Sequence, residues 1–354
     1  MAFHYSNVFV QWIGIAMPPE VVRTSDLERP LADIYAKYGL PPDLVEKMTG
    51  IRERRFWPAR ASIADFACRA AHDALERAGV HPQDLGALIY GSVCREALEP
   101  ATACLVAAQL GVSHNALIYD LANACLSMLN GVVEVANRIE LGQIRCGLVV
   151  GCESARDIIT QTVRRLAKGH PSLDELYLTL ATLTGGSGAA AILLTDGTLG
   201  QTCGHRLLGG VHQTWPQAHG LCRWEFVSHP DDFEKGLYAQ RLTTHGPETL
   251  REGIALAKST WDRFLPHLKW DRSHIGRVIT HQVGRSNRQR LLSELCLDPR
   301  RDFPTYGYLG NMGAVALPMT IGLAERDGVL TPGQRVALLG IASGLSCMML
   351  GVEW

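Results

Sequence analysis

Two kinds of hydrophobic pattern alternate along this chain of 354 residues. Short runs rich in Val, Ile, Leu and Ala have the length of buried β-strands, whereas longer stretches repeat apolar residues every three or four positions, as amphipathic helices do. This alternation is typical of an α/β protein in which helices cover mostly buried sheets. The expected strands are 8–16, 85–91, 116–120, 146–151 and 189–194 in the first half, and 206–211, 278–280, 336–340 and 346–352 in the second.

The helical stretches between these strands give the two halves of the chain a similar layout. The expected helices are 62–78, 101–110, 126–141, 249–265, 287–295 and 314–327. We therefore predict one domain-sized half at 1–196 and a second at 197–354, joined near Asp196-Gly197. Two segments, 157–183 and 212–245, lack a clean pattern, and they are either insertions that cover a site or surface excursions without function.

Charge and cysteine usage exclude several classes of function. The 34 basic and 35 acidic residues nearly balance, so nothing suggests binding to nucleic acid or to an anionic membrane surface. The apolar run 8–16 is too short for a membrane span. The ten cysteines are scattered through apolar stretches, which predicts a reducing, cytoplasmic compartment, and no Cys/His cluster has zinc-ligand spacing, so we predict no metal.

One cysteine lies where a predicted strand turns into a predicted helix. Cys125 follows the apolar run 116–121 and the small residues at 122–124, and it precedes a helical pattern that Gly142 is placed to end. The N–H groups and dipole at a helix N-terminus favour a thiolate, which is the nucleophilic form of cysteine. The alternative is a buried, inert cysteine, which is the commoner case.

Three further positions are candidates for the same site. His281 ends a predicted strand, and Asn311 lies in a glycine-flanked turn, so both are where α/β folds collect reacting groups. The small-residue loop around Ser343 could bring a backbone N–H group close to an oxyanion. Taken singly, His281 and Asn311 better fit structural roles, as a satisfied histidine and a turn asparagine, and a tight hairpin is the alternative for the loop around Ser343.

Five landmarks, in this order, resemble those of the thiolase-fold condensing enzymes, in the ketoacyl-ACP synthase III branch. They are Asn123-Ala-Cys125, the glycine-rich run 184–194, His281-Gln282, Gly310-Asn311 and the loop 340–344. The segment 49–55 also resembles the TGIxxR segment of this branch, and the likeness spans about residues 7–354. The resemblance implies a thiolase fold, in which two similar βαβα halves form a layered α-β-α-β-α core. The first half would carry the nucleophilic cysteine, and the second half the histidine and asparagine.

Within this branch, the nearest likeness is to the members that condense two acyl-CoA thioesters head to head. It rests on segments 93–104, 137–143 and 151–154 and on His281-Gln-Val. The resemblance implies an acyl-enzyme on Cys125, an oxyanion held at Cys125 and Ser343, and an enolate held by His281 and Asn311. It also implies that Glu99 reaches across a homodimer interface into the partner's site as the base.

The same resemblance implies the substrates and the product. Long- or medium-chain acyl-CoA thioesters would be the substrates, with no separate cofactor, and the product would be a 2-alkyl-3-ketoacyl-CoA or the β-keto acid of an olefin or β-lactone pathway. Enzymes that act later in such a pathway are the implied partners. Leu44 and Met48 replace the Trp and Arg that often hold the CoA nucleotide, and Gly284 replaces the Asn of the HQAN motif, so the nucleotide-binding residues stay unassigned.

Three alternatives are open at this point. The nearest is a decarboxylating 3-oxoacyl-ACP synthase III that uses malonyl-ACP or malonyl-CoA, for which Glu99 would be incidental. A papain-type hydrolase shares the order Cys, His, Asn, but the sequence around Cys125 lacks the motif of those proteases. A non-catalytic scaffold would be expected to have lost Cys125, His281 or Asn311, and all three are present.

Overall fold

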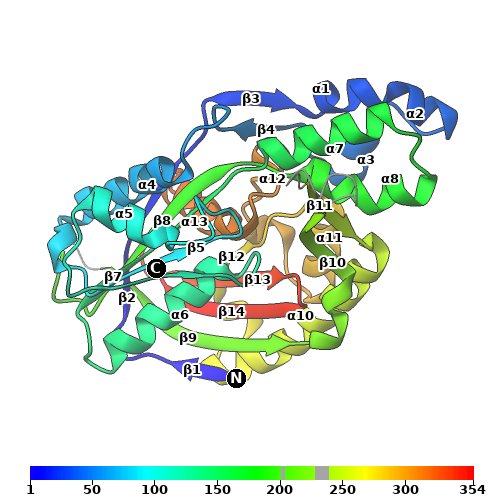
Figure 1. Cartoon of the computed structure of the whole chain (residues 1–354). Coiled ribbons are helices and arrows are strands. Elements are labelled where there is room, and N and C mark those ends of the chain that lie inside the picture. The colour runs from blue at the N-terminus through cyan, green and yellow to red at the C-terminus, as the bar shows by residue number, and fades with distance from the viewer. Residues whose placement is uncertain (201–203, 228–238) are drawn as a thin grey trace.

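The structure is a computed structural model of the chain, and it describes residues 1–200, 204–227 and 239–354. A ten-stranded sheet forms its centre (Figure 1). In spatial order, nine of these strands are β12 (Ile275–Thr280), β13 (Arg335–Ala342), β14 (Ser346–Glu353), β9 (His205–Thr214), β2 (Phe9–Ala16), β8 (Gly188–Thr195), β7 (Cys146–Glu153), β5 (Ala87–Gly91) and β6 (Leu117–Leu121). The tenth, β1 (Ala2–His4), pairs with β9.

The sheet consists of two parts that are joined by a short pairing. Strands β6, β5, β7, β8 and β2 form one part, and β12, β13, β14, β9 and β1 form the other. Between the parts, and among the described residues, Phe9 and Val10 of β2 pair with Arg206 and His205 of β9. Each part mixes parallel pairs, such as β5 with β7 and β12 with β13, with antiparallel pairs.

Helices cover both parts of the sheet and also fill the space between them. On the outer face of the first part lie α4 (Ile63–Ala78) and α5 (Thr102–Leu110). Between the two parts lie α6 (Ser127–Glu140) and α13 (Ala316–Arg326). On the outer face of the second part lie α10 (Gly246–Leu268) and α11 (Arg285–Glu294). The predicted α-β-α-β-α layering is therefore confirmed.

The central helix α6 shows why these residues form this core. Leu129, Val132, Ala136 and Ile139 recur at helical spacing and are all buried between the two parts of the sheet. Each large aliphatic side chain stabilises the fold by roughly 1.5–3 kcal/mol when it is fully buried. The helix ends at Glu140, which confirms the predicted stop before Gly142, and Gly142 itself adopts a left-handed conformation.

Every strand and helix that the sequence predicts is present, with its ends within three residues of the prediction. The prediction succeeds because strands such as β7 and β8 are buried along their whole length and therefore read as continuous apolar runs. No helix within the described part of the chain has both the length and the apolar character needed to cross a membrane.

A second group of elements packs together at one end of the main sheet, and we call it the cap (Figure 1). Residues 22–56, 155–183 and Leu242 share its hydrophobic core. Its elements are β3 (Glu20–Arg23), α1 (Thr24–Glu28), α2 (Ala32–Lys37), α3 (Leu44–Thr49), β4 (Glu53–Phe56), α7 (Arg156–Lys168), α8 (Leu173–Thr179), β10 (Cys222–Val227) and β11 (Ala239–Thr244). Both segments that lack a clean pattern thus contribute to the cap, although residues 228–238 of the second lie outside the described residues.

Candidate active site

Cys125 lies in a tight turn between β6 and α6, at the predicted strand-to-helix junction. The Ser127 hydroxyl holds this turn, because it accepts a hydrogen bond from the Asn123 N–H at 2.8 Å and donates one to the Ala124 carbonyl at 2.7 Å. Ala124 adopts a left-handed conformation with φ of +46°, which is uncommon for a residue other than glycine. The turn leaves Cys125 half-buried.

Glycines allow the start of α6 to lie directly against both parts of the sheet. A Cβ atom on Gly91 of β5 would lie 2.9 Å from the Ser127 carbonyl oxygen. One on Gly340 of β13 would lie 2.6 Å from the side chains of Leu126 and Leu129. β13 therefore passes close to the Cys125 turn, and its last residue directly precedes Ser343, which is half-buried.

The same strand β13 also holds His281. The His281 N–H donates to the Leu339 carbonyl at 2.9 Å, and the next residue, Gly340, is the one in contact with Leu126. His281 is therefore bonded to the residue of β13 that precedes Gly340, and Gly340 contacts the residue that follows Cys125. The segments that carry these two predicted site residues thus pack on neighbouring residues of one strand.

The buried environment leaves Cys125 as a thiol. Burial, as the largest cause, and the nearby Glu153 carboxylate together raise the pKa of Cys125 to about 12. The expectation that a helix N-terminus would make this residue a thiolate is therefore wrong for the single chain. Helix α6 begins only at Ser127, two residues after Cys125.

The His281 side chain is neutral at ordinary pH. Burial lowers the pKa of its imidazole to about 4, because the charged form loses its hydration. Within the described residues, no side chain hydrogen bonds to this imidazole. A neutral imidazole can donate one hydrogen bond and accept another, so both nitrogens are available to a substrate.

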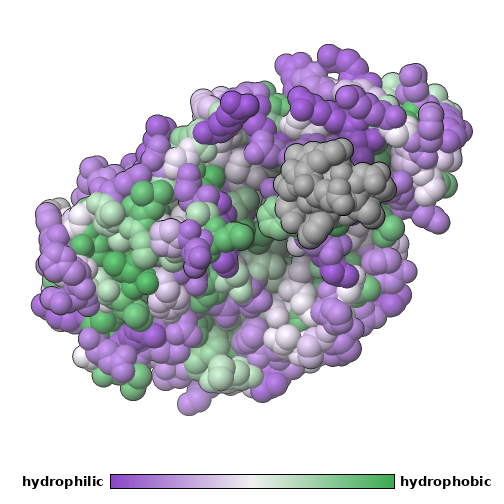
Figure 2. Space-filling model, viewed as in Figure 1, coloured by the Kyte–Doolittle hydropathy of each residue, from purple (hydrophilic) through white to green (hydrophobic). Residues whose placement is uncertain are grey.

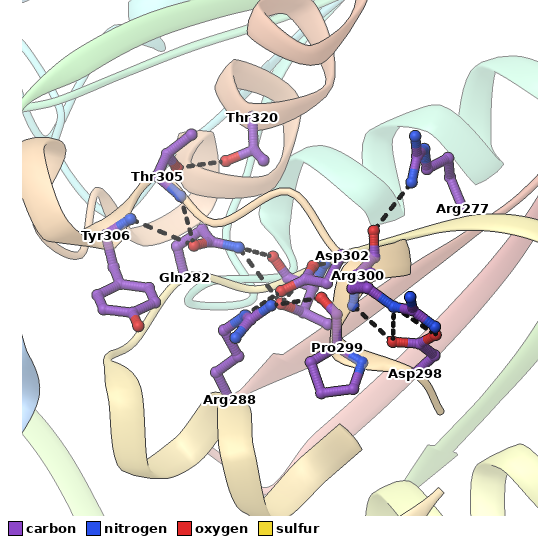
Figure 3. A network of polar contacts seen from close by, with 11 residues as sticks. Arg277, Gln282, Arg288, Asp298, Pro299, Arg300, Asp302, Thr305, Tyr306 and Thr320 are labelled. Carbon is purple, nitrogen blue, oxygen red and sulfur yellow. Dashed lines mark hydrogen bonds and ion pairs between the residues drawn. The ribbon is translucent and has the colours of Figure 1, made fainter. Parts of the chain in front are cut away.

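Gln282 connects His281 to the segment that leads to Asn311 (Figure 3). Its side-chain amide donates to the Thr280 carbonyl at 2.8 Å, at the end of β12. Its side-chain oxygen accepts from the N–H groups of Thr305 at 2.9 Å and Tyr306 at 3.2 Å, where α12 (Tyr306–Leu309) begins. Because Gln282 is buried, these bonds fix the strand end relative to the helix that precedes Asn311.

An ion pair between Asp302 and Arg288 also holds the end of β12. Asp302 accepts hydrogen bonds from the N–H and hydroxyl of Thr280 and forms an ion pair with Arg288 of α11 (Figure 3). Burial raises the pKa of Asp302, whereas Arg288 and the hydrogen bonds act in the opposite direction. The side chains of Gln282 and Asp302 therefore both hold the end of β12.

The Asn311 turn is paired to the glycine-rich run that follows the cap helices. The Asn311 N–H donates to the Thr184 carbonyl, and the Asn311 carbonyl accepts from the Gly186 N–H, both at 2.9 Å. A Cβ atom on Gly186 would lie 1.9 Å from the Leu309 carbonyl oxygen, so only glycine fits there. The side-chain oxygen of Asn311 accepts from the Gly313 N–H at 3.1 Å, which leaves the side-chain NH2 group free to donate to a substrate.

Glu153 is a buried carboxylate that the sequence analysis did not assign to the site. It ends β7 and is 4% exposed. It accepts from the N–H groups of Val93, Cys94 and Ala314, and its charge raises the pKa of Cys125. Because Ala314 follows Asn311 by three residues, Glu153 holds the end of the Asn311 turn. The sequence feature that could have identified Glu153 is a carboxylate at the end of an otherwise apolar strand.

Glu99 does not meet these residues within the single chain. It lies in the connection between β5 and α5, where residues 95–100 are all exposed. It forms no hydrogen bond or ion pair with the residues that the structure describes. Its predicted role requires a second copy of the chain.

The cap lies against the site, but it does not reveal a nucleotide site. The Met48 carbonyl accepts from the Ser286 hydroxyl, and a Cβ atom on Gly284 would lie 3.1 Å from the Thr49 carbonyl oxygen. Leu44 is buried in the core of the cap, whereas Met48 is exposed. Cys222 of β10 also lies near Cys125, because it is one of the groups that contribute to the raised pKa of that thiol.

Comparisons with known proteins agree with this arrangement. Residues 46–197 match the thiolase N-terminal domain family, and residues 265–354 match the C-terminal region of 3-oxoacyl-[acyl-carrier-protein] synthase III. The chain is 47% identical to an acyl-CoA:acyl-CoA alkyltransferase of Shewanella oneidensis, over 99% of both chains. It is 31% identical to the enzyme of that name from Xanthomonas campestris, again over 99% of both.

A crystal structure of Xanthomonas campestris OleA has the same fold, with a TM-score of 0.92 and 31% identity over 99% of this chain and 98% of that chain. Other crystal structures of that protein contain cerulenin, lauric acid and lauroyl-CoA, or carry replacements of a cysteine, a glutamate and a histidine. These are the residue types of Cys125, Glu99 and His281.

We predict that Gly186→Ala lowers the free energy of unfolding by about 2–4 kcal/mol, because the new methyl group would overlap the Leu309 carbonyl. Urea denaturation measures this change. Gly220→Ala is the matched control, since a Cβ atom there meets nothing within 4 Å. Equal effects of the two substitutions would contradict the close pairing of the Asn311 turn.

The lowered pKa of His281 predicts a pH-dependent stability. As pH falls below about 6.5, the unfolded chain protonates this histidine while the native protein keeps it neutral until about pH 4, so the free energy of unfolding falls. Between pH 7.5 and pH 5, wild type should lose about 2 kcal/mol more than His281→Gln. Urea denaturation at both pH values measures this difference, and an identical pH response of the two proteins would show that the native imidazole is not neutral.

Proposed function

The chain belongs to the acyl-CoA:acyl-CoA alkyltransferase family of thiolase-fold condensing enzymes, and on this basis we propose that it joins two fatty acyl-CoA thioesters head to head in a Claisen condensation. The observation that supports the proposal is that the segments of Cys125 and His281 both contact β13, and that Glu153 holds the end of the Asn311 turn and acts on Cys125. A nucleophile that can hold an acyl group would thus lie beside two donors suited to an enolate oxygen. The proposed reaction needs no cofactor, since the CoA thioesters are its substrates.

In the first half-reaction, the sulfur of Cys125 attacks the carbonyl carbon of one acyl-CoA. The N–H groups of Cys125 and Ser343 would stabilise the oxyanion of the tetrahedral intermediate. The carbon–sulfur bond to CoA then breaks, and the proton of the Cys125 thiol leaves with CoA as its free thiol. Because the pKa of Cys125 is raised in the single chain, we expect the thiol to ionise only when the substrate is bound.

In the second half-reaction, a second acyl-CoA loses an α-proton and becomes an enolate. The side-chain NH2 group of Asn311 and an N–H group of neutral His281 would donate to the enolate oxygen. The enolate carbon attacks the acyl group on Cys125, and the carbon–sulfur bond to the enzyme breaks. The product is a 2-alkyl-3-ketoacyl-CoA, and its hydrolysis gives the β-keto acid.

Glu99 of the partner subunit would accept the α-proton, since an acyl-CoA without a carboxylate to lose requires a base. The exposed connection that carries Glu99 starts at the end of β5, next to the edge strand β6. Leu105 of α5 is 38% exposed and Leu117 of β6 is 42% exposed. Figure 2 shows hydrophobic residues gathered over α5 in the left half of the view. An apolar face beside a sheet edge without a partner strand supports a homodimer at this position.

Several finer points belong to the same proposal. Saturated medium- or long-chain acyl-CoA is the expected substrate class, because a related protein has been crystallised with lauroyl-CoA. The reducing compartment inferred from cysteine usage supports a cytoplasmic location, and the cysteines that the structure describes are all unpaired. Enzymes that act on the β-keto product are the proposed partners.

The direct test is to incubate the purified protein with lauroyl-CoA alone. We expect release of free CoA thiol and a ketone after decarboxylation of the product. Condensation that occurs only when malonyl-ACP or malonyl-CoA is added would instead identify a decarboxylating synthase, and it would contradict the head-to-head reaction.

Two substitutions should separate the half-reactions. Cys125→Ser should reduce acylation by at least about 1000-fold, because the acyl acceptor is lost. Glu99→Gln should leave acylation within about threefold of wild type but slow condensation by about 100-fold or more. Mass spectrometry of the acyl-enzyme and a ketone assay measure the two steps.

Glu96→Gln is the matched control for Glu99→Gln. Glu96 lies three residues earlier in the same exposed connection, and its carboxylate is held by the N–H groups of Ile63 and Ala64. The Glu96→Gln variant should condense lauroyl-CoA at the wild-type rate. If Glu99→Gln also does so, Glu99 is not the base.

A further inference from the structure

We propose that Glu153 is a positioning residue for the condensation step, because it holds the Asn311 turn and the start of the connection that carries Glu99 in a fixed relation. This inference rests on the proposed function and adds a role for a residue that takes no part in bond making. Each copy of Glu153 would thereby support the enolate site of its own subunit and the base that this subunit contributes to its partner.

The contacts of the carboxylate join two segments that are far apart in the sequence. One oxygen accepts from the Val93 N–H at 3.1 Å and from the Ala314 N–H at 3.2 Å, and the other accepts from the Cys94 N–H at 3.3 Å. Val93 and Cys94 begin the connection between β5 and α5, and Ala314 ends the turn that contains Asn311. Any displacement of the carboxylate therefore moves both segments.

The Asn311 turn is shaped to approach Glu153 closely. Gly313 adopts a left-handed conformation with φ of +52°, and a Cβ atom there would lie 3.0 Å from an oxygen of Glu153. Asn311 is thus held on both sides. Gln282 fixes the helix before it, and Glu153 fixes the backbone after it.

The hydrogen-bond partners of Glu153 require a carboxylate. It accepts only backbone N–H donors in these three bonds, and no Lys or Arg forms an ion pair with it among the described residues. Burying a charge is costly unless hydrogen bonds compensate, so a carboxylate at this depth is not explained by packing alone. A glutamine would turn an NH2 group toward at least one of these donors, where no hydrogen bond can form.

The charge of Glu153 opposes ionisation of Cys125, which the first half-reaction requires. The effect of Glu153 on condensation can therefore be measured separately from its effect on Cys125. The charge of Glu153 raises the pKa of the Cys125 thiol. Removing the charge should therefore make Cys125 easier to ionise while it loosens the Asn311 turn. Damage that was only structural would not lower the pKa of Cys125 while it slows condensation.

The test is Glu153→Gln in the full-length protein. We expect acylation by lauroyl-CoA within about threefold of wild type, and condensation slower by about 100-fold, because small displacements of reacting groups have effects of this size. The rate of Cys125 alkylation by iodoacetamide, followed against pH, should have a lower midpoint than in wild type. Glu153→Asp keeps the charge and shortens the reach, so it should slow condensation without lowering that midpoint.

Glu140→Gln is the matched control, since Glu140 also accepts backbone N–H groups, from Ser6 and Asn7, but lies at the far end of α6. It should leave both rates and the alkylation midpoint unchanged. A double variant provides a further check, because Glu153→Gln should add little to the condensation defect of Asn311→Ala if it acts through that turn.

The outcomes separate this inference from the proposed function. If wild type condenses lauroyl-CoA and Glu153→Gln does so at the same rate, the positioning role alone is contradicted. Equal losses of acylation and condensation, with an unchanged alkylation midpoint, would also contradict it. A wild-type protein that does not condense lauroyl-CoA would overturn the proposed function and this inference together.

Discussion

The site depends on the close pairing of the Asn311 turn with residues 184–186. Here two backbone segments hydrogen bond with no side chain between them, because the Leu309 carbonyl lies where a Cβ atom of residue 186 would be. This contact joins the half of the chain that carries Cys125 to the half that carries His281 and Asn311. The glycines of the run are explained by this approach of backbone to backbone rather than by flexibility.

The buried surroundings of the site also determine its charges. Burial keeps Cys125 protonated and His281 neutral in the single chain, and Glu153, a carboxylate beside them, is held by backbone N–H groups. In the proposed reaction, neutral donors would suit an enolate oxygen, and a base supplied from another subunit would be brought close only in the assembled dimer.

The sequence predicts the sheet and its covering helices because buried strands and amphipathic helices have local periodicity. It does not predict the cap, whose core combines Leu31, Phe56 and Leu180 from three distant segments of short helices. Cys125, His281 and Asn311 are found at the expected ends of elements. The predicted thiolate is wrong because the burial of Cys125 depends on distant parts of the chain. The sequence does not predict the role of Glu153 because the backbone N–H groups that donate to it can belong to any residue type.

The central claim is that the acyl group on Cys125 becomes the ketone part of the product. It is tested most directly by adding less than one equivalent per Cys125 of lauroyl-CoA labelled with carbon-13 at its carbonyl carbon, removing any free thioester, and then adding unlabelled lauroyl-CoA in excess. We expect the label at the ketone carbon of the product, which nuclear magnetic resonance can locate. A label in the thioester or acid carbon, or a product without label, would contradict the account.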